Sequence, residues 1–183
     1  MRRLPYIALA MSAAMAAYSV EPTIPLVDRH TPGRIFLEQA DSLVSNPLVP
    51  DGQVLMGNVI FRRGDMFMYC DSACFYTNAV ADSMEAFGNV HMEQGDTLFL
   101  YGDRLEYSGL RSLATIYADY EEPVRLINRD VTLSTSVLNY DMAANLGYYL
   151  TGGVLTDHHN TLESVEGEYS PATKDANFYR HVT

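Results

Sequence analysis

Apolar and polar residues alternate along most of this 183-residue chain, in short stretches that return about every thirty residues. The stretch at 58–61 has counterparts at 89–92 and 124–127, each with an apolar face and a more polar one. Such alternation is typical of a strand with one buried face. Because no 3.6-residue period interrupts the pattern from residue 34 onward, we predict antiparallel β-structure with no helix longer than two turns.

The repeat has recognisable anchors. Gly57-Asn58-Val59 recurs as Gly88-Asn89-Val90 and, more loosely, as Gly152-Gly153-Val154. The anchor valines, separated by 31, 34, 30 and 28 residues, are Val59, Val90, Val124, Val154 and Val182. A period between 20 and 50 residues indicates stacked supersecondary units, so we expect a repeat fold or an elongated sheet assembly.

Turn residues follow the first three anchors at one place in each repeat: Arg63-Gly64-Asp65, Gln94-Gly95-Asp96 and Asn128-Arg129-Asp130. Gly and Asp there suit a tight hairpin or bulge. The first of these spells the integrin-binding tripeptide, but its counterparts do not, so we interpret it as a turn.

Tyrosines end the apolar stretches of the repeat. Seven residues after three of them comes a small residue, which gives the pairs Tyr107 and Ala114, Tyr140 and Gly147, and Tyr169 and Ala176. An amphipathic ring at a strand end predicts a packing role, with the hydroxyl left in water.

The N-terminus has the pattern of an export signal. Arg2-Arg3 precede a short apolar run rich in small residues, which predicts a signal peptide at 1–20, with a retained anchor as the alternative. Residues 21–33 are proline-rich and predict an extended tether, and 34–183 are long enough for one domain with a core. The net charge of −11 and the single lysine, Lys174, argue against nucleic acid and anionic membrane surfaces as partners.

Candidate chemistry along the chain is sparse. Cys70 and Cys74 fall on one predicted strand, about 13 Å apart, which is too far for a disulfide, and no ligand in phase with them suggests a metal. We expect two half-buried thiols. His158-His159 cannot chelate one ion together unless they lie in a loop.

A row of carboxylates recurs with the repeat at Asp41, Asp71 and Asp103. We interpret these aspartates as structural, binding turn amides. No Ser-His-Asp spacing, phosphate loop or zinc signature is present, so we predict no enzyme, no metal and no cofactor.

Several stretches together resemble a known family: Leu55–Phe61, Met68–Ala73, Ala86–Leu98 and Tyr101–Asp103, with Ala86–Asp103 the most specific. They are similar to the OstA-like proteins, the LptA-type family of lipopolysaccharide-transport domains in its Bacteroidetes-type form, and the likeness covers residues 34–183. The resemblance implies an elongated antiparallel β-jellyroll, or β-taco, whose two sheets fold along one edge around an apolar groove. Longer members continue beyond the position of Val182-Thr183, which leaves a truncated chain and a short paralogue both open.

The resemblance also implies a function. In the family, the groove carries the acyl chains of lipopolysaccharide across the periplasm, and domains join edge to edge into a bridge between the membranes. We therefore expect an exported periplasmic protein, with outer-membrane association open, whose partners are lipid A acyl chains and other Lpt-type proteins or further copies of itself. The residues predicted to line the groove are Val59, Phe61, Val90, Met92, Leu98, Val124, Leu126 and Leu133.

Two other functions compete with lipid transport. The first is a structural β-solenoid that assembles end to end without a ligand, since repeat folds with open edges template further pairing. The second is a sugar-active enzyme using Asp71, Asp103 or Glu106, which would need two carboxylates roughly 5 to 10 Å apart in an open cleft.

Overall fold

The structure, a computed structural model, describes residues 34–45, 52–77 and 79–183. The predicted signal peptide and tether lie outside the described residues. The described chain forms fifteen strands and no helix, in one continuous sheet whose strand pairs are all antiparallel. The predicted all-β antiparallel fold is therefore confirmed.

Four long strands bend in the middle and belong to both layers of the molecule: β3 (Gly52–Arg63), β4 (Met66–Tyr76), β5 (Ser83–Gln94) and β6 (Leu98–Ser108). The pairing register shifts at each bend. In β3 and β5 the bend is a Gly-Asn pair in the left-handed region, with φ of 76° and 47° at Gly57-Asn58 and of 75° and 47° at Gly88-Asn89. Bulges of this kind re-aim a strand, so the sheet turns back on itself along a line that we call the fold line.

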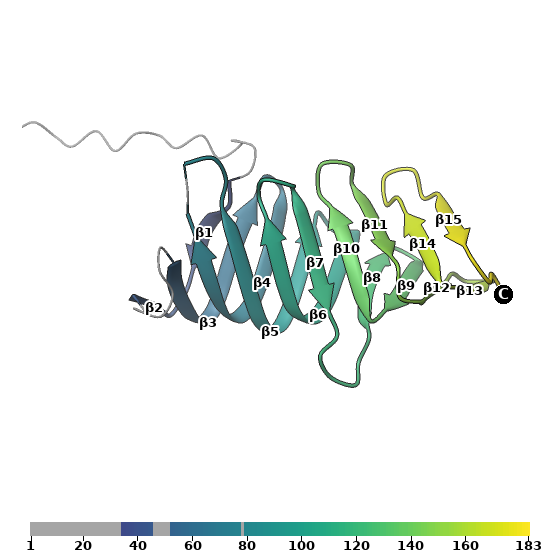
Figure 1. Ribbon diagram of the computed structural model, residues 1–183, viewed down its shortest axis with the longest axis horizontal. Coiled ribbons are helices and arrows are strands. Elements are labelled where there is room, and N and C mark those ends of the chain that lie inside the picture. Colours follow the sequence, from purple (N-terminus) through teal and green to yellow (C-terminus); the bar gives the residue numbers. More distant parts are fainter. Residues whose placement is uncertain (1–33, 46–51, 78) are drawn as a thin grey trace, which may run out of the picture.

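The fold line divides the sheet into two walls. Wall 1 contains the halves of the long strands nearer the β3–β4 and β5–β6 turns, together with β1 (Phe36–Gln39), β8 (Val124–Asn128), β9 (Val131–Thr135), β12 (Gly153–Thr156) and β13 (Thr161–Ser164). Wall 2 contains the other halves, β2 (Ser42–Ser45), β7 (Leu113–Tyr117), β10 (Val137–Asp141), β11 (Leu146–Tyr149), β14 (Glu166–Tyr169) and β15 (Ala176–Tyr179). In Figure 1, β7, β10, β11, β14 and β15 lie in front of β8, β9 and β12.

The chain continues to cross the fold line after β6. A longer loop, 118–123, connects β7 to β8, whereas Ser136 alone separates β9 from β10 and Val165 alone separates β13 from β14. Thr183 exchanges two backbone hydrogen bonds with Glu163, which places the fifth anchor region beside β13 in wall 1. In each period of about thirty residues, the chain thus enters each of the two walls and returns from it once.

Hairpin turns lie along the edge opposite the fold line, which we call the mouth. On wall 1 the predicted turns connect β3 to β4, β5 to β6 and β8 to β9, and Gly64, Gly95 and Arg129 occupy equivalent left-handed positions with φ of 62°, 61° and 58°. Figure 1 shows the β10–β11 and β14–β15 turns of wall 2 along the upper edge and the 118–123 loop along the lower edge.

The core lies between the walls. Inward side chains of wall 1, such as Phe61, Met92 and Leu126, pack in one apolar cluster with wall 2 residues such as Leu105 and Leu138, and each of these five is fully buried. Each fully buried side chain of this size contributes about 1.5–3 kcal/mol. The predicted shared interior of the in-phase residues is therefore confirmed.

The seven-residue spacing after the tyrosines is explained by cross-strand pairing in wall 2. Large and small residues alternate along one row that crosses six strands, in the order Tyr107, Ala114, Tyr140, Gly147, Tyr169 and Ala176. Each small residue leaves room for the rings on either side. The prediction that the hydroxyls stay in water was wrong, because the three tyrosines of the row are at most 3% exposed.

The cysteines differ from the prediction in one respect. Both thiols are free, and Cys74 is half-buried as expected, but Cys70 is buried. Cys70 continues the inward phase of Met66 and Met68 and pairs with Val59, and the register shift before Ser72 reverses that phase, so Cys74 does not share the inward face. Loss of hydration raises the pKa of the Cys70 thiol to about 12.

Candidate functional site between the two walls

The eight residues predicted to line a groove all lie on the inner face of wall 1, at three depths. The valines 59, 90 and 124 adjoin the fold line, and the row through Phe61, Met92, Leu126 and Leu133 lies midway. Leu98 lies near the mouth. All eight are at most 4% exposed, so they are core residues in this structure, and their role in holding a lipid remains a prediction.

The interior is filled by side chains from both walls, and methionine is prominent among them. Met66, Met68, Met84 and Met92 are each at most 4% exposed. Methionine is unbranched and flexible, so it adapts to the shape of its neighbours. An interior of this composition can repack around an inserted chain more readily than one built from branched residues.

In the part of the chain that the structure describes, polar contacts connect the walls across the mouth at three places. At the β1 end, Asp82 of wall 2 accepts hydrogen bonds from the Arg34 guanidinium at 2.7 Å and from the Ile35 backbone at 3.1 Å. In the middle, Arg63 of wall 1 donates to Ser112 Oγ of wall 2 at 3.0 Å. Further along, the Asn128 side chain of wall 1 donates to the Tyr169 hydroxyl of wall 2 at 3.0 Å.

These mouth residues were not identified as functional candidates from the sequence. Arg63 and Asn128 were assigned to turns because Gly or Asp follows them. A signal was nevertheless present, since Arg63 has the same phase as Val59 and Phe61 and therefore faces inward. No pattern in the sequence identifies Ser112, because it reaches the mouth through the pairing of β6 and β7.

The recurrent aspartates lie at the fold line, where they hydrogen-bond neighbouring parts of the fold. Asp41 and Asp71 each accept a hydrogen bond from the asparagine of the adjacent bulge, Asn58 and Asn89 respectively, at 2.8 Å. Asp103 accepts from the backbone amides of residues 119 and 120 at 2.8 and 3.0 Å. Each carboxylate therefore stabilises one crossing of the chain between the walls.

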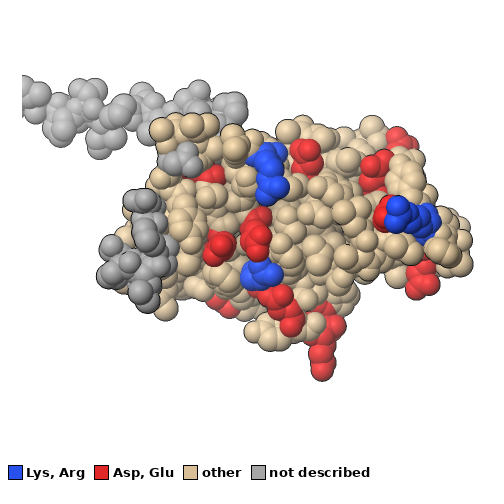
Figure 2. All heavy atoms as spheres, viewed as in Figure 1, with Lys and Arg blue, Asp and Glu red and all other residues tan. Residues whose placement is uncertain are grey.

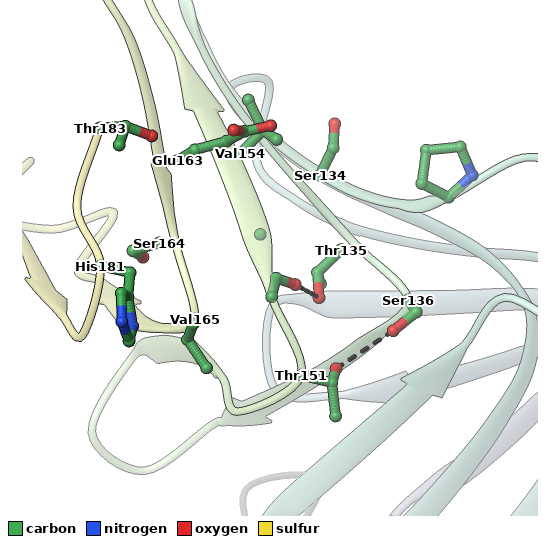
Figure 3. A pocket seen from close by; sticks show the side chains of 13 residues that line it. Ser134, Thr135, Ser136, Thr151, Val154, Glu163, Ser164, Val165, His181 and Thr183 are labelled. Atoms are coloured by element: carbon green, nitrogen blue, oxygen red, sulfur yellow. Dashed lines mark hydrogen bonds between the residues drawn. The ribbon is translucent and has the colours of Figure 1, made fainter.

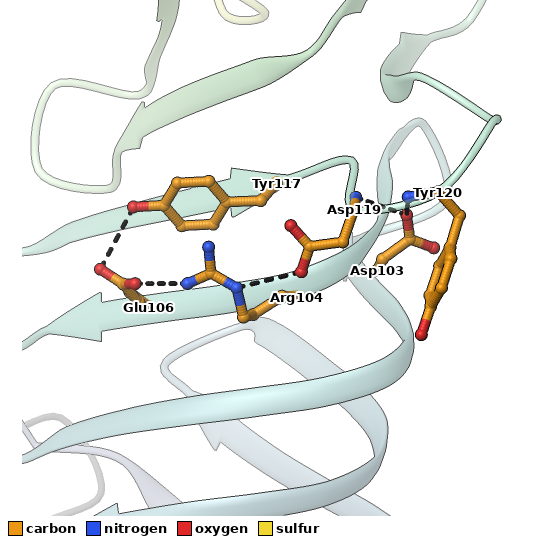
Figure 4. Close-up of polar contacts among 6 residues, drawn as sticks. All are labelled: Asp103, Arg104, Glu106, Tyr117, Asp119 and Tyr120. Carbon is orange, nitrogen blue, oxygen red and sulfur yellow. Dashed lines mark hydrogen bonds and ion pairs between the residues drawn. The ribbon is translucent and has the colours of Figure 1, made fainter.

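Glu106, the remaining acidic candidate, belongs to a network on the outer face of wall 2 (Figure 4). Arg104 stacks over the Tyr117 ring at 3.8 Å and forms ion pairs with Glu106 and with Asp119. The Tyr117 hydroxyl donates to Glu106 at 3.2 Å. Glu106 thus binds both the Arg104 guanidinium and the Tyr117 hydroxyl. Because Arg104 also pairs with Asp119, this network stabilises the start of the 118–123 loop.

The largest hollow described, about 580 Å³, lies where the chain crosses the fold line near β12 and β13 (Figure 3). Hydroxyl groups line much of it, but the fold already uses them. Thr135 donates to the Gly152 carbonyl at 2.7 Å, Ser136 and Thr151 share a hydrogen bond at 3.1 Å, and Ser164 donates to the Glu166 carbonyl at 2.9 Å. These contacts close the turns between the walls.

An aromatic row crosses the outer face of wall 1. Tyr69, His91 and Tyr101 are direct cross-strand neighbours, and the His91 ring stacks on Tyr69 at 5.3 Å and on Tyr101 at 4.6 Å. Loss of hydration lowers the pKa of His91, an effect that nearby Glu93 partly offsets. Tyr69 donates to Glu93 at 2.6 Å, and this bond is the main reason that the pKa of Tyr69 rises to about 12.

The surface has no extended patch of one charge on the face shown in Figure 2, where acidic and basic side chains lie beside one another. Among the described residues no group of three or more His, Cys, Asp or Glu side chains could hold a metal ion. His158 and His159 lie in the turn after β12, with ring centroids 6.4 Å apart. The described part of the chain has no helix that could cross a membrane.

A family model and solved structures match this chain, with different weight. A family model described as OstA-like protein matches residues 33–183. Among solved structures, LptH, the LptA-homologous periplasmic component of the lipopolysaccharide transport device of Pseudomonas aeruginosa, is 18% identical with a TM-score of 0.49, over 59% of this chain and 76% of that one. No curated protein matches.

Proposed function

The chain belongs to the OstA-like protein family, and from that premise we propose that it is a periplasmic component of lipopolysaccharide transport that holds acyl chains between its two walls. The observation that carries the proposal is the continuous apolar inner face of wall 1, whose residues are buried and keep one phase through successive repeats. Each methylene of an acyl chain buried there would contribute about 0.8 kcal/mol.

Binding requires the walls to separate or the interior to repack, because side chains fill the interior in the structure. Two features support this change. Within the described residues the backbone joins the walls along the fold line alone, and the methionines between the walls are adaptable. The ligand would replace contacts between the walls, and its polar head group would remain at the mouth.

The test is photo-crosslinking from a benzophenone amino acid placed at Met92, Leu126 or His91. Met92 and Leu126 are fully buried between the walls, whereas the adjacent His91 faces outward. Lipopolysaccharide should label the protein from the two interior positions and not from position 91. Equal labelling from all three positions, or none from any, in variants that melt like the unmodified protein would contradict the proposal.

A structural protein that assembles end to end without a ligand is the second candidate, and the filled interior is the observation that favours it. Within the described residues, β1 and β2 each pair with β3 alone, and β15 pairs with β14 alone, so strand edges are free at both ends of the walls. Edges of this kind support pairing with further chains. This candidate predicts concentration-dependent assembly with no labelling by lipid from positions 92 or 126.

A further inference from the structure

Arg63 is an arginine on the inner face of wall 1, at the mouth. It is two residues from the fully buried Phe61 on the same strand and pairs in register with the buried Met66. Its neighbour Arg62 has the opposite orientation and forms an ion pair with Glu38 at 2.6 Å on the outer face. Two adjacent arginines thus lie on opposite sides of one wall.

The Arg63 guanidinium has no carboxylate partner among the described residues, unlike Arg34, Arg62, Arg104 and Arg180. It donates a hydrogen bond to the neutral hydroxyl of Ser112, at 3.0 Å, and its guanidinium also lies close to the Tyr107 hydroxyl. Its Nε–H group is buried without a partner. Arg63 as a whole is half-buried, but a buried N–H donor without an acceptor is costly.

Tyr107 contributes a second unsatisfied group at the same place. Its side chain is 3% exposed, and its hydroxyl is buried without a hydrogen bond of good geometry. The hydroxyl is close enough to Arg63 for the cation to lower the pKa of Tyr107, against the larger opposing effect of burial. Both Arg63 Nε–H and Tyr107 O–H are donors, and an oxyanion, which only accepts, would satisfy both.

The surroundings fit a ligand with an apolar part. Tyr107 pairs with Met84, which in turn pairs with Phe75, and the Phe75 and Phe61 rings are 5.3 Å apart below the mouth. Two acidic residues of the mouth have other partners, since Asp65 accepts from Gln94 at 2.9 Å and Asp82 pairs with Arg34, and Asp82 also lies close enough to Tyr107 to raise its pKa. The apolar interior therefore begins directly beneath the unpaired donors.

We propose that Arg63, Tyr107 and Ser112 form a binding site for an oxyanion, a phosphate or a carboxylate, carried by an acyl-chain ligand whose chain lies between the walls. The proposal rests on the proposed function, because it assigns the place where the head of the ligand is held. The anion would take over the Arg63 guanidinium from Ser112 and so release the contact that joins the walls at this point.

The test compares three ten-carbon probes, decyl phosphate, decanoate and decanol, by titration calorimetry below the concentrations at which they form micelles. The wild-type protein should bind one or both anionic probes about tenfold or more tightly than decanol, and the two anionic probes distinguish phosphate from carboxylate. Arg63→Gln should abolish this preference while leaving decanol affinity unchanged. Arg62→Gln removes the same charge from the outer face and should keep the preference.

Tyr107→Phe provides a milder variant in case Arg63→Gln does not fold, and it should reduce the preference several-fold without affecting decanol. Equal affinity of the wild type for all three probes, or an unchanged preference in both variants, would overturn the anion site while leaving acyl-chain binding intact. Absence of binding for all three probes would refute the proposed function as well. Inorganic phosphate that binds as tightly as decyl phosphate would overturn the assignment of the site to an acyl-chain ligand.

Discussion

Replacement of Gly88 by alanine should destabilise the protein through two separable effects at the fold line. Gly88 has a φ of +75°, where an L-residue is strained by about 1–2 kcal/mol, partly offset by the lower entropy of the unfolded alanine chain. An added Cβ would also lie 2.5 Å from Asp71 Oδ2, too close for any real contact, so the carboxylate must move. That movement removes the 2.8 Å hydrogen bond from Asn89 to Asp71, worth about 1 kcal/mol.

Gly95→Ala is the matched control. Gly95 has a φ of +61° in the β5–β6 turn, and an added Cβ would meet nothing within 4 Å, so only the backbone strain remains. We therefore expect a loss of about 2 kcal/mol for Gly88→Ala and about 1 kcal/mol for Gly95→Ala. In an Asp71→Ala background the two substitutions should cost the same, because the obstructing carboxylate is gone.

The assay is urea unfolding followed by far-UV circular dichroism, since the chain has no tryptophan to report by fluorescence. A difference of about 1 kcal/mol corresponds to a shift of about 2–4 °C in melting temperature for a domain of this size. The losses of unfolding free energy caused by Gly88→Ala and by Gly95→Ala are compared in the wild-type background. If these two losses agree within about 0.3 kcal/mol, Asp71 does not constrain the bend.

Three further outcomes are expected. Val90→Asp places an unpartnered carboxylate in the core and should cost several kcal/mol, about 3 or more; a variant that melts within a degree or two of the wild type would mean that Val90 does not face the interior. Burial lowers the pKa of His91 in the folded state, so the unfolded chain binds more protons and stability should fall as the pH drops below about 6.5. His91→Gln should lessen that fall between pH 7.5 and 5.5, and parallel urea midpoints for the two proteins would refute it. At pH 8 iodoacetamide should modify the native protein at Cys74 in preference to Cys70, whose buried thiol has a pKa of about 12, and mass spectrometry showing equal modification would contradict this.

Much of the fold could be predicted from the sequence because strand alternation and turn residues are local patterns that recur in each repeat. Alternation around Val59 and Val90 gave the inward face, and the Gly-Asp turns gave the hairpins at the mouth. The family resemblance added the folding of the sheet into two walls. The seven-residue step from Tyr107 to Ala114 was visible as a pattern, but its meaning required the cross-strand register, which sequence spacing alone does not specify.

The features that the sequence left undetermined depend on contacts between distant strands. A straight strand was assumed from Cys70 to Cys74, but the bulge between them puts the two thiols out of phase, so Cys70 is buried and Cys74 is half-buried. The tyrosine hydroxyls were expected in water because nothing local indicated that a second wall would cover them. Arg63 joins Ser112 across 49 positions, and no local pattern relates two residues separated by a complete repeat and a half.

Because the chain crosses the fold line at regular intervals, the length of the molecule depends on the number of its thirty-residue sequence repeats. Each unit of about thirty residues contributes two strands to each wall where the long strands lie, and neighbouring strands are about 4.8 Å apart, so one unit extends the walls by about 10 Å. In-frame duplication of a unit such as residues 59–89 would supply its own bend, its own turns and its own inward residues. Length in this architecture can therefore change in whole increments, whereas an insertion of one residue within a strand would exchange the inner and outer faces of the rest of that strand.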